Sequence, residues 1–341
     1  MKKITLYDVA KKSGVSPKTV SRVINNEDSV SDHKREIVLK AVEELNYRPN
    51  NSARSLRNNR AYAIGLLYDN LSPAYILDLQ AGLLDICEKA QFNVLIVSCD
   101  IGNSALLEQV INLLDNSRVD GFVLSPPVSD NQSLIDLLTS RDCPFVRIAP
   151  VNTTTVSPFV SVNDCELSQE ITQHLLSLGH KRIGFIAGDV SHRASIERYK
   201  GYQQALSQAG LQLERNLVEQ GDFSFESGEA CAHRLMAQEK PPSAIFACND
   251  YMAAGVLKTA QQLGVLIPQK LSVVGFDDAP VSQQLWPMLT TVKQPVQEIA
   301  ATSAQLLLDI IQNRTQKEQA VKLECEMVIR ESTAAFSTAK G

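Results

Sequence analysis

The sequence predicts an α/β protein with a small helical head, and three observations lead to this class. The N-terminal stretch holds three short amphipathic helical patterns, whereas from Ala63 onward short apolar runs alternate with helical stretches. Such alternation is typical of parallel sheets covered by helices on both faces. The charge is also divided: residues 1–60 hold 13 Lys and Arg against 7 Asp and Glu, a net of +6, and the remainder holds 20 against 31, a net of −11. A basic head on an acidic body places any contact with a polyanion at the N-terminus.

Two short helices around a glycine turn open the chain. The first runs from Leu6 to about Lys12 and ends at Ser13-Gly14, where glycine allows a positive φ. The second begins with Ser16 as N-cap and Pro17 in the first helical position. Its apolar residues Val20, Val23 and Ile24 recur at helical spacing and face the first helix, which leaves a polar outer face made of Lys18, Thr19, Ser21, Arg22 and Asn25. This pattern predicts a helix-turn-helix, because the solvated face of an ordinary helical hairpin, the alternative, normally mixes both charge signs.

A third helix and a basic segment complete the head. The third helix starts at Ser31 or Asp32, closes a small core over the first two, and ends before Pro49. The segment from Asn50 to Arg57 fits a helix with Asn50 as its cap, but eight residues are too few for a stable isolated helix. It would become helical only on DNA or against a copy of itself. The alternative is a flexible basic linker that continues to Arg60.

The sequence from Ala63 onward predicts two similar lobes, each a doubly wound parallel sheet. The expected strands are 63–67, 94–98, 121–124, 145–148, 160–162, 183–187, 244–248, 273–276, 290–292 and 325–329. Amphipathic helices between them include 77–90, 106–114, 167–178 and 198–209. Ligands of such sheets bind beyond the carboxyl ends of the strands, so Asn249-Asp250 and Asp277-Asp278, which follow two strands, are candidates. Residues in these positions also serve as helix caps, and the pattern alone leaves both interpretations open.

Several classes of protein are disfavoured. The seven cysteines are scattered, without a Cys-x-x-Cys pair, which indicates small core residues in a reducing compartment. No run approaches 18 apolar residues, and the basic start is interrupted by Tyr7, Asp8, Lys11 and Lys12, so we expect a cytoplasmic protein. The chain has no Gly-x-Ser-x-Gly, dinucleotide or phosphate-loop motif, and its five histidines lack metal-ligand spacing. We therefore expect no enzyme activity, no metal and no cofactor.

The chain resembles the lac and purine repressor family of bacterial regulators over nearly its whole length. The head carries this resemblance in LYDVAKKSGVSPKTVSRVIN (6–25), VSDHKREIVLKAVEELNYRPN (30–50) and the hinge NSARSL (51–56). It continues through IGLL (64–67), LGHKRIGFIAG (178–188), FACNDYMAAGV (246–256), LSVVGFDD (271–278) and LTTVKQP (289–295). The resemblance implies a head, a hinge helix and a two-lobe, periplasmic-binding-protein-like core.

The resemblance also implies how the head contacts DNA. The second helix enters the major groove, where a Lys or Arg can address guanine, and a hinge helix wedges its leucine into the minor groove. Pro17 departs from relatives that read a base with a side chain there, so readout should fall more on Lys18. The implied DNA-binding residues are Thr5, Leu6, Ser16, Pro17, Lys18, Thr19, Ser21, Arg22, Asn25, Asn50, Ala53 and Leu56.

An effector site between the lobes is implied by the same resemblance, with residues Tyr75, Arg147, Arg198, Phe223, Asn249 and Asp277. A guanidinium donates to hydroxyls or a carboxylate, and a carboxylate such as Asp277 accepts from hydroxyls, which suits a polyol or sugar. Tyr75 and Phe223 are aromatic in matching positions and are equally consistent with core packing. Arg147 departs from the family's more usual acidic residue; it fits an acidic or phosphorylated sugar, and it fits equally an internal ion pair with Asp100 or Asp164.

These expectations define a repressor of carbohydrate-utilisation genes with three parts. They are a DNA-binding domain (1–49), a hinge helix and linker (50–60), and an effector-binding core (61–341). In the core, lobe 1 covers about 61–161 and 293–322, and lobe 2 about 162–292 and 323–341. The expected partners are pseudo-palindromic operator DNA, a small sugar-like effector and a second copy of the chain, because the tail after Ile329 has no heptads for a tetramer. The alternatives are control by a partner protein or by a nucleoside or acidic effector and, more remotely, a sugar-binding protein or enzyme without a regulatory role.

Overall fold

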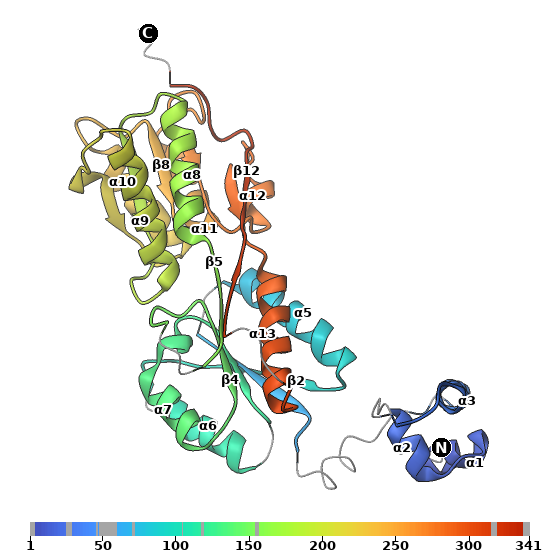
Figure 1. The fold of residues 1–341 in the computed structure, drawn as a ribbon. Coiled ribbons are helices and arrows are strands. Elements are labelled where there is room, and N and C mark those ends of the chain that lie inside the picture. Colours follow the sequence, from blue (N-terminus) through green and yellow to red (C-terminus); the bar gives the residue numbers. More distant parts are fainter. Residues whose placement is uncertain are drawn as a thin grey trace. The chain divides into compact units, whose positions relative to one another are not determined.

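A computed structural model describes residues 4–24, 29–45, 47, 60–69, 72–103, 105–116, 119–153, 157–314 and 319–336. The chain divides into two compact units, Met1–Tyr62 and Ala63–Gly341, which are the head and the body (Figure 1). The body contains a six-stranded sheet, a four-stranded sheet and a two-stranded ribbon. The α/β class and the two-lobe plan predicted from the sequence are confirmed.

The head is a bundle of three helices, α1 (Leu6–Ser13), α2 (Pro17–Ile24) and α3 (Asp32–Glu44). Gly14 takes the left-handed conformation, with φ of 68°, and turns the chain between α1 and α2. The Ser16 hydroxyl accepts the backbone N–H of Thr19 at 3.1 Å, as expected of a helix cap. The buried side chains that join the three helices are Val9, Ala10, Val20, Val23, Val30, Val38 and Ala41.

The first lobe is built on a parallel sheet in the order β11-β5-β4-β3-β1-β2. The strands are β1 (Ala63–Tyr68), β2 (Asn93–Ser98), β3 (Phe122–Leu124), β4 (Phe145–Ile148), β5 (Phe159–Val162) and β11 (Ala320–Leu323). Helices α5 (Pro73–Lys89) and α13 (Val296–Ile311) cover one face, and α6 (Ala105–Asp115) and α7 (Gln132–Ser140) cover the other (Figure 1). A short 3-10 helix, η1 (Val128–Asp130), precedes α7. The near-continuous apolar strands follow from this double cover.

The second lobe repeats the plan on a smaller scale, with parallel strands in the order β7-β6-β8-β9. The strands are β6 (Ile183–Ala187), β7 (Val218–Gln220), β8 (Ala244–Ala247) and β9 (Ser272–Val274). Its helices pair as α8 (Asp164–Ser177) with α9 (Arg193–Gln208), and α10 (Phe225–Met236) with α11 (Asp250–Gln262). Two short elements complete it, η2 (Arg215–Leu217) and α12 (Val281–Gln284).

Three segments carry the chain between the lobes. The first leaves β5 and enters α8, and the second leads from β10 (Thr291–Lys293) into α13. The third leads from β11 to β12 (Glu326–Val328), which pairs antiparallel with β10. The Asn163 side chain joins the first and third segments, since its amide donates to Glu324 and its carbonyl accepts the N–H of Cys325 at 2.7 Å.

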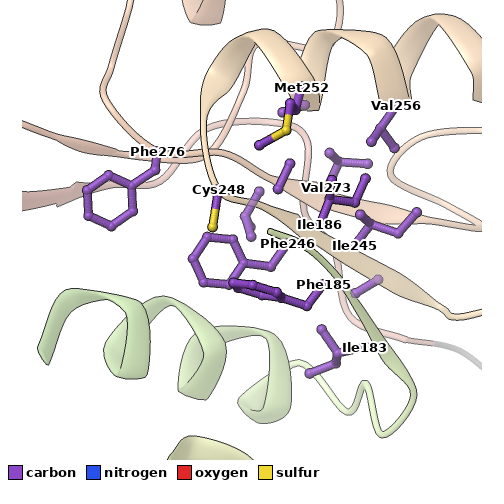
Figure 2. Close-up of a cluster of buried hydrophobic side chains, with 14 of the residues drawn as sticks. Ile183, Phe185, Ile186, Ile245, Phe246, Cys248, Met252, Val256, Val273 and Phe276 are labelled. Atoms are coloured by element: carbon purple, nitrogen blue, oxygen red, sulfur yellow. The ribbon is translucent and has the colours of Figure 1, made fainter. Parts of the chain in front are cut away.

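An aromatic core holds the second lobe together (Figure 2). Phe185 of β6 stacks on Tyr202 of α9 with ring centroids 4.8 Å apart, and meets Phe246 of β8 edge-on at 5.2 Å. The Tyr202 hydroxyl donates to the carbonyl of Ile183 at 2.8 Å, so no buried donor is left unpaired there. This packing fixes α9 against the sheet and therefore fixes the side chains that α9 presents at the strand ends.

The differences from the predicted elements lie at strand ends and sheet edges. β9 stops at Val274, two residues earlier than predicted, because the N–H of Gly275 bonds to Thr290 and leaves the ladder. The two strands that the sequence pattern missed, β7 and β11, are edge strands with half-exposed residues. Edge strands of this kind lack the continuous apolar run by which the others were recognised.

Candidate functional site

A cluster of charged and aromatic side chains lies at the carboxyl ends of the second lobe's strands. The loop after β8 supplies Cys248 and Asn249, and the loop after β9 supplies Phe276 and Asp277. Arg198 comes from α9, and Asp164 is the first residue of α8. The structure thus brings residues from four separate segments to the edge where ligands of parallel sheets bind.

Arg198 is the centre of this cluster and is 2% exposed. Its Nε donates to Asp164 at 2.8 Å, and its Nη1 donates to the carbonyl of Cys248 and lies 3.4 Å from Asp277 Oδ1. The Phe276 ring covers the guanidinium, with its centroid 3.6 Å from Cζ (a cation–π contact). Burial disfavours the charged form, but the carboxylates of Asp164 and Asp277 outweigh it, so the pKa of Arg198 is raised. Arg198 is a fixed cation.

Asp277 is held in an unusual backbone conformation, with φ of 112°. Its N–H donates to the carbonyl of Val292 at 2.8 Å, and its Oδ1 accepts Nε2 of Gln294 at 2.6 Å. Burial raises the pKa of Asp277 to about 6, although the positive charge of Arg198 and the hydrogen bond from Gln294 act against this rise. The side chain is still 27% exposed, so part of the carboxylate can accept a ligand's hydroxyl.

Asn249, predicted as an effector contact, has a structural role in the folded chain. Its Oδ1 caps α11 by accepting the N–H of Met252 at 2.9 Å, and its Nδ2 donates to the carbonyl of Phe223 at 2.9 Å. The helix-cap interpretation that the sequence left open is therefore what the structure contains. An amide has a second N–H, so capping and ligand contact are compatible.

Tyr75 approaches the same cluster from the first lobe. It lies in the first turn of α5 and is half-buried. Burial and then the negative charges of Asp277 and Asp164 raise the pKa of its hydroxyl, while Arg198 acts in the opposite direction. Tyr75 is thus within electrostatic range of the Arg198 cluster.

Phe223 lies on the other side of the strand ends, in a positive-φ conformation of 71°. Its ring meets the imidazole of His192 edge-on, with centroids 5.2 Å apart, and fills the space where a side chain on Gly188 would stand. Phe223 is half-buried, and these contacts support the core-packing interpretation, while its lining of an effector site stays a prediction.

Arg147 lies in a different environment from that of Arg198. It is 1% exposed; its Nε donates to Ser157 Oγ at 3.0 Å and its Nη1 to the carbonyl of Asn152 at 2.8 Å. Burial lowers the pKa of Arg147, and the charge of Asp130 opposes this effect. Asp130 also accepts the N–H groups of Val151 and Asn152. These contacts describe a side chain that holds the loop after β4, while Asp164, one of the two partners suggested for Arg147, pairs with Arg198.

Sequence reasoning missed several members of the cluster. Asp164 was considered only as a partner of Arg147, and Phe276, Gln294 and His192 were not singled out. Phe276 directly precedes Asp277, so its position after a predicted strand was the available signal. No local pattern connects Asp164 with Arg198, because the pair is 34 residues apart.

The outer face of α2 carries the predicted DNA contacts. Lys18 and Ser16 are exposed, and Pro17, Thr19, Ser21 and Arg22 are half-buried. Thr5 and Leu6 stand at the start of α1, where the N–H and hydroxyl of Thr5 donate to Asp8 at 2.8 and 2.6 Å. The remaining predicted contacts, Asn25, Asn50, Ala53 and Leu56, lie outside the described residues. α2 offers two cations and no carboxylate, which suits a phosphate-lined groove.

The described part of the chain offers neither a metal site nor a membrane span. No group of three or more His, Cys, Asp or Glu there has the arrangement of a metal site. Among the described helices, none is both long and apolar enough to span a membrane.

Comparisons with known proteins agree with this architecture. Residues 5–50 match the model of bacterial regulatory proteins of the lacI family, and residues 172–333 match the periplasmic binding protein-like domain. The ribose operon repressor of Haemophilus influenzae is 34% identical over 96% of this chain and 98% of its own length. A solved complex of the transcriptional regulator CelR with cellobiose has a TM-score of 0.75 at 29% identity, covering 96% of this chain and 99% of that one. The lac repressor dimer bound to operator and the anti-inducer ONPF has a TM-score of 0.77 at 29% identity, covering 98% and 100%.

A helix-turn-helix head followed by a two-lobe binding-protein core defines a DNA-binding transcriptional regulator and not an enzyme. The chain belongs to the LacI family of bacterial regulatory proteins. The family resemblance stated from the sequence is confirmed.

Proposed function

We propose that this regulator is a repressor whose operator binding is controlled by an uncharged, hydroxyl-rich effector of the sugar class. The observation that carries the proposal is the buried Arg198, fixed between Asp164 and Asp277 at the carboxyl ends of the strands. A fixed guanidinium donates to ring hydroxyls, and the exposed part of Asp277 accepts from them. Tyr75, Phe223 and Asn249 would line the same site.

The charge of the cluster favours a neutral effector over an acidic one. Asp164 and Asp277 place two carboxylates beside one guanidinium, which opposes the entry of a further anion. Arg147, the residue that suggested an acidic or phosphorylated sugar, donates to Ser157 and to the Asn152 carbonyl and lies close to Asp130. Its contacts support a structural role. One relative is named as the repressor of a ribose operon, and the CelR structure is a complex with cellobiose; both sugars are neutral, which supports the same class.

We further propose that the protein binds a pseudo-palindromic operator as a homodimer, with one head on each half of the operator. The lac repressor, whose fold this chain shares, was solved as a dimer on its operator. Each α2 would enter a major groove with Lys18, Thr19 and Arg22 toward the base edges. Effector binding changes the relation of the two lobes and so biases the operator-binding form.

A thermal-shift screen with neutral sugars, sugar phosphates, uronates and nucleosides tests the effector class, followed by calorimetry on each compound that raises the melting temperature. We expect neutral sugars to stabilise the wild-type protein and to leave Arg198→Ala unchanged. Arg314→Ala, which removes an exposed arginine paired with Asp309, is the matched control and should respond as the wild type does. Stabilisation by uronates or phosphates alone would contradict the neutral class, and stabilisation by nucleosides alone would contradict a sugar.

A further inference from the structure

The loop that carries Asp277 is fixed from outside the cluster by Arg330, which follows β12, the strand at the end of the third segment between the lobes. Arg330 Nη2 pairs with Asp278 Oδ1 at 2.6 Å, and the two side chains are 13% and 11% exposed. Asp278 directly follows Asp277 and also has a positive φ, of 54°. Two consecutive aspartates in a conformation that L-residues rarely adopt need support from their surroundings.

The remaining donors of Arg330 close the far side of the same loop. Its Nη1 donates to the carbonyl of Leu289 at 2.9 Å and to Ser282 Oγ at 3.2 Å. The Ser282 hydroxyl in turn donates to Asp278 Oδ1 at 2.9 Å. The backbone N–H of Arg330 donates to Thr290 Oγ1 at 2.9 Å. One arginine therefore connects the start of the loop, its short helix α12 and its return to β10.

We propose that Arg330 is a positioning residue for the effector site: by holding Asp278 it keeps Asp277 aimed at Arg198 and Gln294. The proposal rests on the proposed effector function and extends it to a residue that does not belong to the Arg198 cluster. A planar guanidinium with three well-placed acceptors restricts a loop more than a flexible ammonium does. A carboxylate displaced by even 1 Å loses much of its contribution to a binding site.

The consequence is a direct link between effector binding and the third inter-lobe segment. Asp277 forms hydrogen bonds with Val292 and Gln294 of the second segment. Arg330 follows β12, the strand at the end of the third segment, and β12 pairs with β10 of the second segment. A shift of the Asp277 loop on ligand binding is thus passed to both segments through hydrogen bonds already present. The crossing strands are the part of the body that must change when the lobes reorient.

Hydrogen exchange of the full-length protein without ligand tests the positioning directly. In Arg330→Met, the amides of Asp277 and Ala279 should exchange about tenfold faster or more, since the loop opens locally. Arg330→Lys, which can still reach Asp278, should lie between Arg330→Met and the wild type. Tyr202→Phe is the control for general destabilisation, because it removes a buried hydrogen bond of the second lobe far along the chain from this loop. In Tyr202→Phe, the ratio of the exchange rates of the loop amides to those of the β6 amides should be the same as in the wild type.

Unchanged loop exchange in Arg330→Met would overturn the proposal, and so would equal acceleration of the loop in Tyr202→Phe. Calorimetry with ribose and with cellobiose as probes then separates this inference from the proposed function. If the wild type binds a probe, Arg330→Met should bind it about tenfold more weakly, with Arg330→Lys partly restored; equal affinity in all three contradicts a positioning role. If the wild type binds neither probe, the sugar proposal loses its support, while the exchange result still decides whether Arg330 positions the loop.

Discussion

Arg198 and Asp164 form a buried ion pair, with Nε 2.8 Å from Oδ1 and both side chains less than 5% exposed. The pair joins α8 to α9, and Arg198 also donates to the carbonyl of Cys248 after β8. A buried ion pair adds little to stability because its desolvation offsets its attraction, but removing one partner leaves an uncompensated buried charge.

Replacing Arg198 with Ala should abolish the effector response and leave operator binding in the absence of effector intact. It should also lower the free energy of unfolding by about 3–5 kcal/mol, because Asp164 is left buried without its partner. The double variant Arg198→Met, Asp164→Asn removes both charges and should recover much of that stability without recovering the response. Chemical denaturation and operator titration, with DNA selected from a random duplex pool, measure the two effects. An effector response retained in Arg198→Ala would remove Arg198 from the site.

Effector affinity should decrease as the solution is acidified through pH 6. Burial raises the pKa of Asp277 to about 6, and the ionised carboxylate accepts hydroxyl hydrogen bonds more strongly than the protonated group does. Binding to the ionised form alone gives affinity about tenfold lower at pH 5 than at pH 7. Calorimetry at both values checks this for whichever sugar the screen identifies. Asp277→Asn should bind weakly at both, and an equally steep pH dependence in that variant would show that another group is responsible.

The contribution of Asp277 to thermal stability should depend on pH in the opposite direction from the contribution of a typical surface carboxylate. The folded chain retains the Asp277 proton at pH values where an unfolded chain, with a pKa near 3.8, has released it. The contribution of this group to stability is therefore lost as the pH rises through 6. The melting temperature of Asp277→Asn relative to the wild type should accordingly be higher at pH 7 than at pH 5. Burial and then the charge of Asp277 raise the pKa of Asp250, so the difference between the two proteins reports this coupled pair of carboxyl groups.

Operator affinity should fall steeply with salt, by about 10³-fold or more between roughly 50 and 200 mM, if phosphate contacts dominate binding. Lys18→Ala should cost about 1–3 kcal/mol and relax the preference at one base position, whereas loss of a phosphate contact would weaken all sequences equally. Lys89→Ala, on α5 of the body, is the control and should bind as the wild type does. A flat salt response would contradict the assignment of the head as the main electrostatic contact.

The packing of α5 on α13 should be intolerant of added volume at Gly82 (Figure 1). A Cβ at this position would overlap the carbonyl oxygen of Gln297 and approach the Ala300 methyl group. Gly82→Ala should therefore lower the free energy of unfolding by about 1–3 kcal/mol despite its gain in helix propensity. Gly102→Ala, where the added Cβ would meet only the Asp100 carboxylate at 3.2 Å, is the control, and equal losses in both would argue against close helix packing.

The parts of the fold that could be predicted are the elements whose local sequence pattern reflects burial in the folded chain. β4 and β6 were placed to the residue because their apolar runs end where the sheet ends. Ser16 and Pro17 likewise fixed the start of α2. β11 was missed because it alternates exposed and half-buried residues at the edge of its sheet.

Some residues of the Arg198 cluster were singled out from the sequence, but its other members and its internal bonds were not. Arg198 and Asp277 followed from the family resemblance, yet their shared neighbour Asp164 depends on how α8 and α9 pack. The roles of Asn249 as a cap and Arg147 as a loop support depend on partners 3 to 26 residues away whose positions only the folded chain defines.

The parallel pairing of β11 with β5 has a consequence for how the protein is made. β5 ends at Val162, and its outer partner begins at Ala320, so β5 has no outer partner until the ribosome has synthesised residues 163–319, which are almost half of the chain. Until then the first sheet presents an unpaired edge, the kind of surface that recruits other strands. Long-range pairing of this type slows folding and exposes nascent chains to aggregation. A variant in which β11 cannot pair with β5 should therefore be produced poorly, although β11 holds none of the predicted DNA or effector contacts.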